Sequence, residues 1–144
     1  MQLLEIEQYL HDKIPLSAAM KIRVVEWTND YLILEAPLAP NRNHLGTAFG
    51  GSLNAIATLT GYGAVWLALD VRDAHVVIRD STIAFRRPVR GDIRAVCPLP
   101  DQAALEAFRS DFNRRGKARL SLQVFIDHEG ERAVEFSGTF VAVK

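Results

Sequence analysis

Apolar residues along this chain recur first at helical spacing and later at the two-residue spacing of strands. Positions 3, 6, 10 and 14 hold leucine or isoleucine, which predicts a helix over residues 1–15 that Pro15 stops. In the second half, Leu120, Leu122, Val124 and Ile126 recur at every second position, and the intervening Arg119, Ser121 and Gln123 are polar. This period is typical of a strand with one buried face. The chain therefore predicts a mixture of helices and strands.

Turn-forming residues divide the rest of the chain into further elements. We expect a β-hairpin with strands at 20–28 and 31–36 around a turn at Asn29–Asp30. A short helix is expected after Asp101, which serves as its N-cap, and Gly116 ends it. The remaining strands are expected at 75–86, 91–97, 117–127 and 131–143, with a hairpin turn at 127–130 before the last strand.

The segment over residues 51–69 is a long helix without a single charged residue. A helix that is apolar on nearly every side must be covered on nearly every side. We therefore predict an α+β fold in which a strongly curved antiparallel sheet wraps this one central helix, within a single domain of residues 1–144. A second copy of the chain is expected to close the remaining face, as a homodimer or a dimer of dimers.

The same uncharged stretch raises the alternative of a membrane span, because residues 43–69 carry no charge. Three glycines between Gly50 and Gly61, together with Asn54, Thr58 and Thr60, favour a buried helix of a soluble protein instead. We expect no membrane span.

Composition narrows the function classes. The 17 basic and 17 acidic residues cancel, so no net charge attracts nucleic acid or membranes. Cys97 is the only cysteine, which excludes a disulfide within the chain and suits a reducing compartment. Acidic residues precede any apolar run at the amino terminus, which is unlike a signal peptide. We expect a cytoplasmic protein without metal or cofactor.

The segment richest in chemistry runs from Asn43 to Ser52, where a loop with paired glycines leads directly into the apolar helix. The start of a helix exposes unpaired N–H groups and carries partial positive charge. Glycine lets a ligand approach those groups closely, which suits a carbonyl oxygen that gains negative charge during attack. The alternative is that Gly50 and Gly51 only permit a tight turn and close packing.

The order of elements and the pattern Asn-x-x-Gly-x-x-x-Gly-Gly before a long helix resemble the hot-dog fold thioesterases. The stretch Ser81–Val89 resembles their third strand, which often ends in Arg-Pro. The chain more specifically resembles the thioesterase-like domain of the YiiD C-terminal type, which follows an acetyltransferase domain in some bacterial proteins. The stretch Leu59–Gly63, of sequence Leu-Thr-Gly-Tyr-Gly, carries that likeness. The resemblance covers residues 15–143.

This resemblance implies a role for several loop and helix residues. The Gly50 N–H would polarise a thioester carbonyl, and Asn43 would hold the nucleophilic water or the substrate. Many relatives have histidine before the two glycines and an acid nine positions later, where this chain has Phe49 and Thr58. Threonine cannot take a proton at neutral pH without a base beside it, so the base must lie elsewhere.

Asp80 is the first candidate for that base. It lies in the middle of the strand expected at 75–86, where aspartate is disfavoured. Simple alternation places Asp80 on the inner face with Val76 and Ile78, and burial there would raise its pKa. The alternative role is an ion pair with an arginine such as Arg79. His44 is the second candidate, and its alternative is an exposed loop residue.

Polar residues of the helix and arginines of the strand end complete the candidate site. Asn54 and Thr58 share one helix face and, with Ser52 or Thr60, could position a water, or else bond to backbone in the core. The resemblance places Arg86 and Arg87 near the pantetheine channel, where they would meet the phosphates of coenzyme A or else simply be solvated. The residues expected to contact substrate are His44, Phe49, Gly51, Ser52, Asn54, Arg86 and Arg87.

These observations favour an enzyme that hydrolyses acyl thioesters of coenzyme A or acyl carrier protein. Asn43, Gly50, Thr58 and Asp80 are its expected catalytic residues. Coenzyme A enters only as part of the substrate. A binding module that keeps the acyl-thioester site without catalysis is the alternative, because the helix acid and the histidine are missing. A dehydratase or hydratase of the same fold is a third hypothesis. The chain has no Gly-x-Ser-x-Gly elbow, which argues against an α/β-hydrolase.

Overall fold

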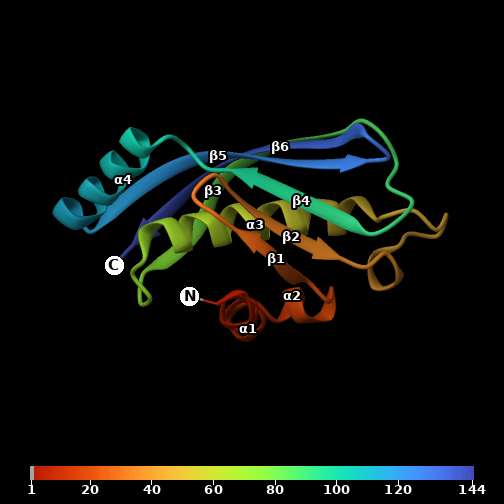
Figure 1. The fold of residues 1–144 in the computed structure, drawn as a ribbon, viewed down its shortest axis with the longest axis horizontal. Coiled ribbons are helices and arrows are strands. Elements are labelled where there is room, and N and C mark those ends of the chain that lie inside the picture. The colour runs from red at the N-terminus through yellow and green to blue at the C-terminus, as the bar shows by residue number, and fades with distance from the viewer. Residues whose placement is uncertain (1) are drawn as a thin grey trace.

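A single curved sheet and the helix that it wraps dominate the structure, a computed structural model that describes residues 2–144 (Figure 1). Within these residues all strand pairs are antiparallel and follow the order β1-β2-β4-β5-β6-β3. The strands are β1 (Arg23–Trp27), β2 (Tyr31–Ala36), β3 (His75–Phe85), β4 (Ile93–Pro98), β5 (Lys117–His128) and β6 (Glu131–Val143).

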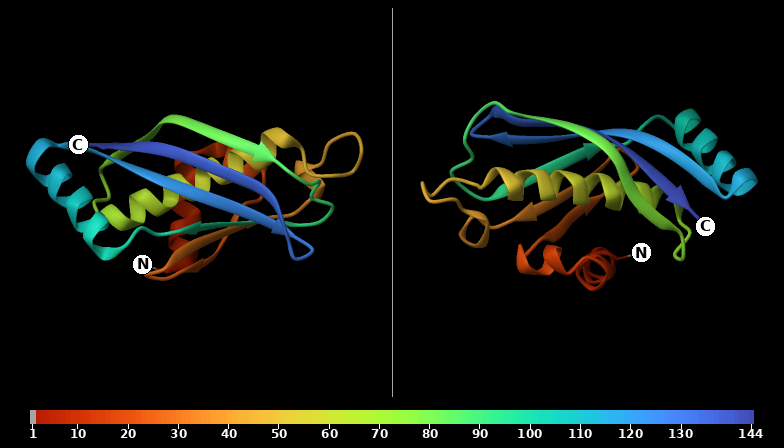
Figure 2. Two further views of the ribbon diagram at one scale, coloured as in Figure 1. Left: turned by 90° about the horizontal axis from the view of Figure 1, so that it is seen from above. Right: turned by 180° about the vertical axis from the view of Figure 1, so that it is seen from behind.

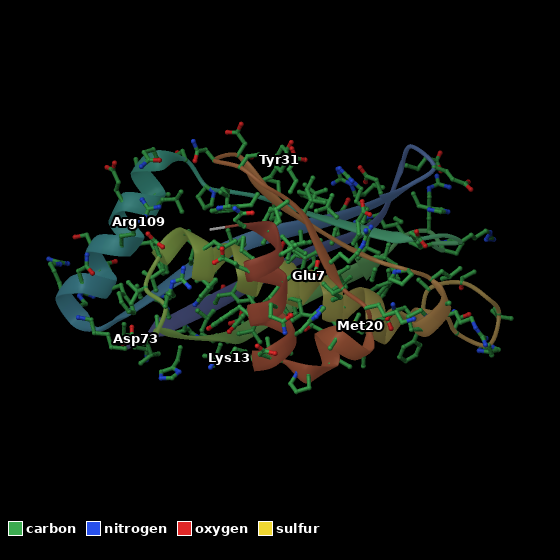
Figure 3. The ribbon with its side chains drawn as sticks, turned by 60° about the horizontal axis from the view of Figure 1, so that its bottom comes forward. Glu7, Lys13, Met20, Tyr31, Asp73 and Arg109 are labelled. Carbon is green, nitrogen blue, oxygen red and sulfur yellow. The ribbon has the colours of Figure 1, made fainter. Side chains whose placement is uncertain are left out.

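The wrapped helix is α3 (Gly50–Leu69), which lies in the concave side of the sheet in all views (Figures 1 and 2). By length and composition this helix could cross a membrane, but 67% of its most apolar 18-residue stretch is buried inside the fold. The predicted core position of this helix is therefore confirmed. Its last turn is held by Arg109 of helix α4 (Gln102–Arg115), whose Nε donates to the Ala68 carbonyl at 2.7 Å (Figure 3).

Two short helices at the amino terminus lie on the side of α3 away from β5 and β6 (Figure 2). They are α1 (Leu3–Lys13) and α2 (Pro15–Ala19). Pro15 ends the first helix as predicted, but it also starts the second, because proline fits the first position of a helix. The ring of Tyr9 stacks on Trp66 of α3 at 3.9 Å between centroids, which fixes α1 against the central helix.

The remaining helices are α4 (Gln102–Arg115) and the single 3-10 turn η1 (Ala39–Asn41). The Asp101 side chain accepts from the Ala104 N–H at 2.8 Å, so the predicted N-cap is confirmed. Gly116 ends α4 with φ of 70°, a left-handed conformation that glycine adopts without strain. Residues Leu105, Phe108 and Phe112 form its buried face.

The strand β3 forms one edge of the sheet and contains a β-bulge at Arg79. Ile78 is paired with Phe140, whereas the next paired residues are Asp80 and Thr139. Because one residue is extra, alternation along the strand is reversed beyond the bulge. Ile78 before it and Ser81 after it both face α3, while Asp80 faces outward beside Thr139.

The alternation predicted for β5 is confirmed, whereas β1 begins at Arg23, three residues later than expected, and β4 begins at Ile93, two residues later. Along β5, alternate residues from Ala118 to Ile126 are buried against α3 and the residues between them are exposed or half-buried. The turn between β5 and β6 consists of Glu129 and Gly130, both with positive φ. Cys97 of β4 is fully buried, and burial raises the pKa of its thiol to about 12, so it is an inert core residue.

Candidate functional site

A groove of about 800 Å³ runs along the one face of α3 that the sheet leaves open. On α3 its lining comes from positions spaced by one helical turn, starting at Gly51 and ending at Tyr62. Strands β3 and β6 form one wall, and the α1–α2 corner forms the other. The wall residues are Val76, Val77, Ile78, Ser81 and Phe140 on one side and Lys13, Ile14 and Leu16 on the other.

Backbone amides without acceptors lie at the start of this groove. The first hydrogen bond of α3 runs from the Leu53 N–H to the Phe49 carbonyl at 3.0 Å, and no side chain caps the helix. Within residues 2–144 the N–H groups of Gly50, Gly51 and Ser52 make no hydrogen bond to the protein. Gly51 is exposed and Gly50 is half-buried. The positive end of the helix is therefore open to a ligand.

Two exposed aromatic rings flank these amides. Phe49 is 56% exposed, and its ring lies so close to Gly51 that a Cβ atom there would collide with it. Phe85, at the end of β3, is 52% exposed, and its ring lies 3.7 Å from the Cβ position of Gly50. An apolar ligand can therefore contact a ring on each side while its carbonyl faces the amides.

The loop before α3 is organised by Asn43. Its Oδ1 accepts from the N–H groups of Leu45 at 2.9 Å and Thr47 at 3.2 Å, and its Nδ2 donates to Thr47 Oγ1 at 2.8 Å. Gly46 supplies the positive φ that the turn requires. These bonds leave one Nδ2 hydrogen for a water or substrate. His44 is exposed in this loop, which extends beyond the end of the helix (Figure 2).

Asn54 and Thr58 both line the groove one turn apart, as their spacing predicts. Thr58 Oγ1 donates to the Asn54 carbonyl at 2.9 Å. The hydroxyl hydrogen is therefore used within the helix, and the oxygen lone pairs remain as acceptors. Ser52 is half-buried and faces a smaller pocket on the other side of the helix start, beside Phe49 and the buried Asn41.

Aromatic side chains gather around Tyr62, at the far end of the α3 lining. Tyr62 is the last α3 residue in the lining, and its hydroxyl interacts with that of Tyr9 from α1. Burial, followed by the neighbouring Tyr9, raises the pKa of Tyr62 to about 12, so its hydroxyl stays neutral. Tyr9 is in turn stacked on Trp66, and Lys13 Nζ lies 5.9 Å from the Tyr9 ring.

The predicted inward orientation of Asp80 is wrong. The bulge at Arg79 turns the Asp80 side chain to the outer face, where it is 70% exposed and lies 3.8 Å from Arg79. The surrounding outer-face residues are the polar side chains of Thr82, Ser121 and Thr139. Asp80 therefore does not join Asn54 and Thr58 in the groove of its own chain.

The two arginines of the strand end already have partners. Arg86 pairs with Glu135 at 3.1 Å and Arg87 with Glu131 at 2.9 Å, and both side chains are more than half exposed. Such exposed ion pairs contribute little to stability, so a phosphate can compete with the glutamates for the same guanidinium groups. The segment that follows them reaches the helix start, because the Ala48 N–H donates to the Val89 carbonyl at 2.8 Å.

Titratable side chains are scarce in the groove. Lys13 and Tyr62 are the titratable residues of its lining, and the raised pKa of Tyr62, about 12, keeps its hydroxyl neutral. Within residues 2–144 no group of three histidine, cysteine, aspartate or glutamate residues could hold a metal ion. The groove therefore offers donors, acceptors and apolar contact, while one chain alone supplies no base to it.

Sequence reasoning missed Tyr9, Tyr62 and Phe85. Tyr62 was visible one turn beyond Thr58 on the same helix face, so the spacing of Asn54 and Thr58 already pointed to it. Tyr9 gave no local signal, because its role depends on how α1 packs on α3. Phe85 faces Gly50 only because the bulge reverses the alternation of β3.

Comparison with known proteins gives a consistent result. The model of a protein family described as "Putative thioesterase (yiiD_Cterm)" matches residues 3–144. A structure of a protein of unknown function from Chlorobaculum tepidum is 34% identical, covers 97% of this chain and 93% of its own, and superposes with a TM-score of 0.91.

Two further solved structures carry a thioesterase description. One, described as a "putative thioesterase" from Shewanella oneidensis, is 35% identical, with 99% and 97% of the two chains covered and a TM-score of 0.84. Another, from Pseudomonas aeruginosa and described as a probable thioesterase, is 26% identical, with 99% and 96% covered and a TM-score of 0.85. The predicted hot-dog fold and the predicted family resemblance are confirmed.

Proposed function

Because this chain belongs to the thioesterase family whose model matches residues 3–144, we propose that it hydrolyses acyl thioesters of coenzyme A or acyl carrier protein. In this reaction a water oxygen forms a bond to the thioester carbon and the carbon–sulfur bond breaks. The water supplies one hydrogen to the departing sulfur, so the products are a carboxylic acid and a free thiol.

The open amides at the start of α3 carry this proposal. As water attacks, the carbonyl oxygen becomes an oxyanion, and N–H groups already aimed at that place stabilise it without rearranging. Gly50 and Gly51 leave room for the oxygen, and the helix adds its partial positive charge. In the proposed pose the carbonyl faces these amides between Phe49 and Phe85.

The acyl chain lies in the groove along α3, and the thiol carrier leaves toward the loop and the strand end. Asn54 and the acceptor side of Thr58 orient the water within the groove. Asn43 acts through the shape of its loop, since its amide is mostly engaged there. Arg86 and Arg87 offer guanidinium groups for coenzyme A phosphates, in competition with Glu135 and Glu131.

A second copy of the chain completes the site in this proposal. The outer edge of β3 has no strand partner among residues 2–144, and Val77 on it is 56% exposed. A long edge strand with apolar side chains favours pairing with another strand. Antiparallel pairing of two β3 strands across a twofold axis would also bring the partner over the open groove.

Replacing Gly50 by proline tests the role of the amide directly. Gly50 is the first residue of α3, where proline is well tolerated, and Phe49 already has the extended conformation that precedes proline (φ −67°, ψ 134°). The substitution removes one N–H and preserves the helix. We expect kcat for release of thiol from acyl-CoA esters to fall about 10²–10³-fold.

Gly50→Ala is the matched control. It keeps the N–H, and its Cβ would lie at an ordinary 3.7 Å from the Phe85 ring. We expect its kcat to stay within about threefold of the unmodified protein, because no donor is lost. Equal rates for the proline and alanine variants would contradict a role for this amide in catalysis.

A non-catalytic module that binds acyl thioesters is the second candidate function. It is favoured because, within residues 2–144, the groove lining contains no aspartate, glutamate or histidine that could act as a general base, and its titratable residues are Lys13 and Tyr62. A general base normally contributes about 10²–10⁴-fold to such a reaction. Saturable binding of acyl-CoA without release of thiol from any ester, at enzyme concentrations near that of the ester, would establish the module and exclude the hydrolase.

A further inference from the structure

The Tyr62 end of the groove bears on the length of the acyl group, on the premise that the proposed function is correct. On α3 the lining runs from Gly51 to Tyr62, eleven positions apart. At the rise of an α-helix this spans about 16 Å. Side chains of a helix lean toward its amino terminus, so the Tyr62 ring covers the turn before it and leaves a path of about 11–16 Å.

Tyr62 is held in place from behind. Tyr9 influences Tyr62 and is itself stacked at 3.9 Å on Trp66, which is only 3% exposed. Movement of the Tyr62 ring toward α1 is therefore opposed by a buried aromatic stack. An acyl chain that follows α3 meets the Tyr62 ring last, after the exposed rings of Phe49 and Phe85 at the mouth, so this ring acts as its end wall.

The end wall is also polar, whereas the path that leads to it is largely apolar. Leu59, Ile78 and Phe140 line that path. The Tyr62 hydroxyl and the side-chain nitrogen of Lys13 supply this polarity. Lys13 comes from the last turn of α1 (Figure 3). A longer alkyl chain would have to displace water from these groups without offering them a hydrogen bond, which is unfavourable.

We propose that Tyr62, braced by Tyr9, limits the substrate to medium-length acyl groups. Carbon–carbon bonds of about 1.5 Å in a staggered, extended chain advance about 1.3 Å per carbon. The path therefore holds an acyl chain of about eight to twelve carbons. Shorter chains bury less apolar surface, so kcat/KM rises with each added methylene group until the end wall is reached.

The test measures thiol release from saturated acyl-CoA esters of four to eighteen carbons. For the unmodified protein we expect kcat/KM to rise up to eight to twelve carbons and to fall at least tenfold at sixteen. In Tyr62→Ala the fall should move to chains about four carbons longer, because the length of the tyrosine ring is freed. Tyr62→Phe keeps the ring and should keep the unmodified length profile.

Leu67→Ala is a control for general destabilisation, because Leu67 is half-buried on α3 outside the groove lining. It should lower the folding stability and leave the length profile unchanged. An unshifted profile in Tyr62→Ala, or an unmodified protein that takes sixteen carbons as well as ten, would overturn the inference. If no ester releases thiol, the proposed hydrolase fails, and the same length series measured as binding of non-hydrolysable thioether analogues decides the role of Tyr62.

Discussion

Single residues in this protein owe their roles to the hydrogen bonds and burial that surround them. Asp80 has the chemistry of a general base, but it is 70% exposed beside Arg79 on the outer face of the sheet, away from the groove. Thr58 has no acidic character at neutral pH, yet its bond to the Asn54 carbonyl fixes the direction in which it accepts. The groove residues that can orient a water, Asn54 and Thr58, are therefore uncharged.

Asp80→Ala provides a prediction at this scale. Because the side chain lies on the outer face of the sheet, its removal should leave kcat for thiol release within about twofold and stability within about 0.5 kcal/mol. Steady-state kinetics and thermal unfolding check both values. A loss of activity of a hundredfold or more with an unchanged melting temperature would show that Asp80 acts in a site formed with another chain.

Helices and strands differ in how well the sequence alone predicts them. The central helix was predictable because it contains no charge over its whole length, and β5 because its alternation is unbroken. The bulge at Arg79 was not, since it is defined by the pairing of β3 with β6 and leaves no mark in the order of residues. Prediction of Asp80 failed for that reason, whereas the open amides of α3 followed from the local sequence.

The site could be predicted only where one element supplies it. Gly51, Asn54 and Thr58 lie on α3, so helical spacing alone places them on the groove, and Gly50 begins the same helix. The contact of Tyr62 with Tyr9 joins residues 53 positions apart through the packing of α1 on α3. Only the assembled fold reveals such long-range contacts.

The loop before α3 gives a prediction at the scale of an element. Asn43→Ala removes two accepted hydrogen bonds and one donated bond, so we expect the free energy of unfolding to fall by about 1–3 kcal/mol and thiol release to fall with it. Denaturant unfolding and kinetics measure the two effects.

Asn43→Asp distinguishes a loop-building role from a direct one. It keeps the oxygen that accepts from Leu45 and Thr47 but has no amide hydrogen for a water or substrate. We expect it to retain at least about a third of the activity and most of the stability. An aspartate variant that is stable but as inactive as the alanine variant would instead indicate that the Nδ2 hydrogen contacts the reacting groups.

The molecule as a whole leaves one side of its central helix and one strand edge open together. The groove lies next to β3, and the exposed apolar side chains around them include Leu16, Val77 and Ile78. Patches of this kind on a small protein mark contact surfaces. A twofold dimer that pairs two β3 strands would cover both features at once, which is why we propose it over other arrangements.

Assembly can be tested on the intact chain. We expect a particle of about 32 kDa in sedimentation velocity, twice the 16.0 kDa of one chain, or about 64 kDa for a dimer of dimers. Ile78→Glu places a charge beside the β3 edge and should shift the mass toward one chain. Ser121→Glu, on the exposed outer face of β5, is the matched control. An unmodified protein that sediments as a single chain at working concentration would contradict the dimer.

The open amides at the start of α3 belong to the main chain, and this has a consequence for how the protein tolerates mutation. Every amino acid except proline supplies the same N–H group at position 50, so almost no codon change removes it. Substitutions among the neighbouring side chains can alter which ester fits while the polarising group persists. A mutational scan that replaces side chains would therefore leave the Gly50 N–H in place in nearly every variant and would not reveal its role. The same scan would recover variants with altered acyl preference.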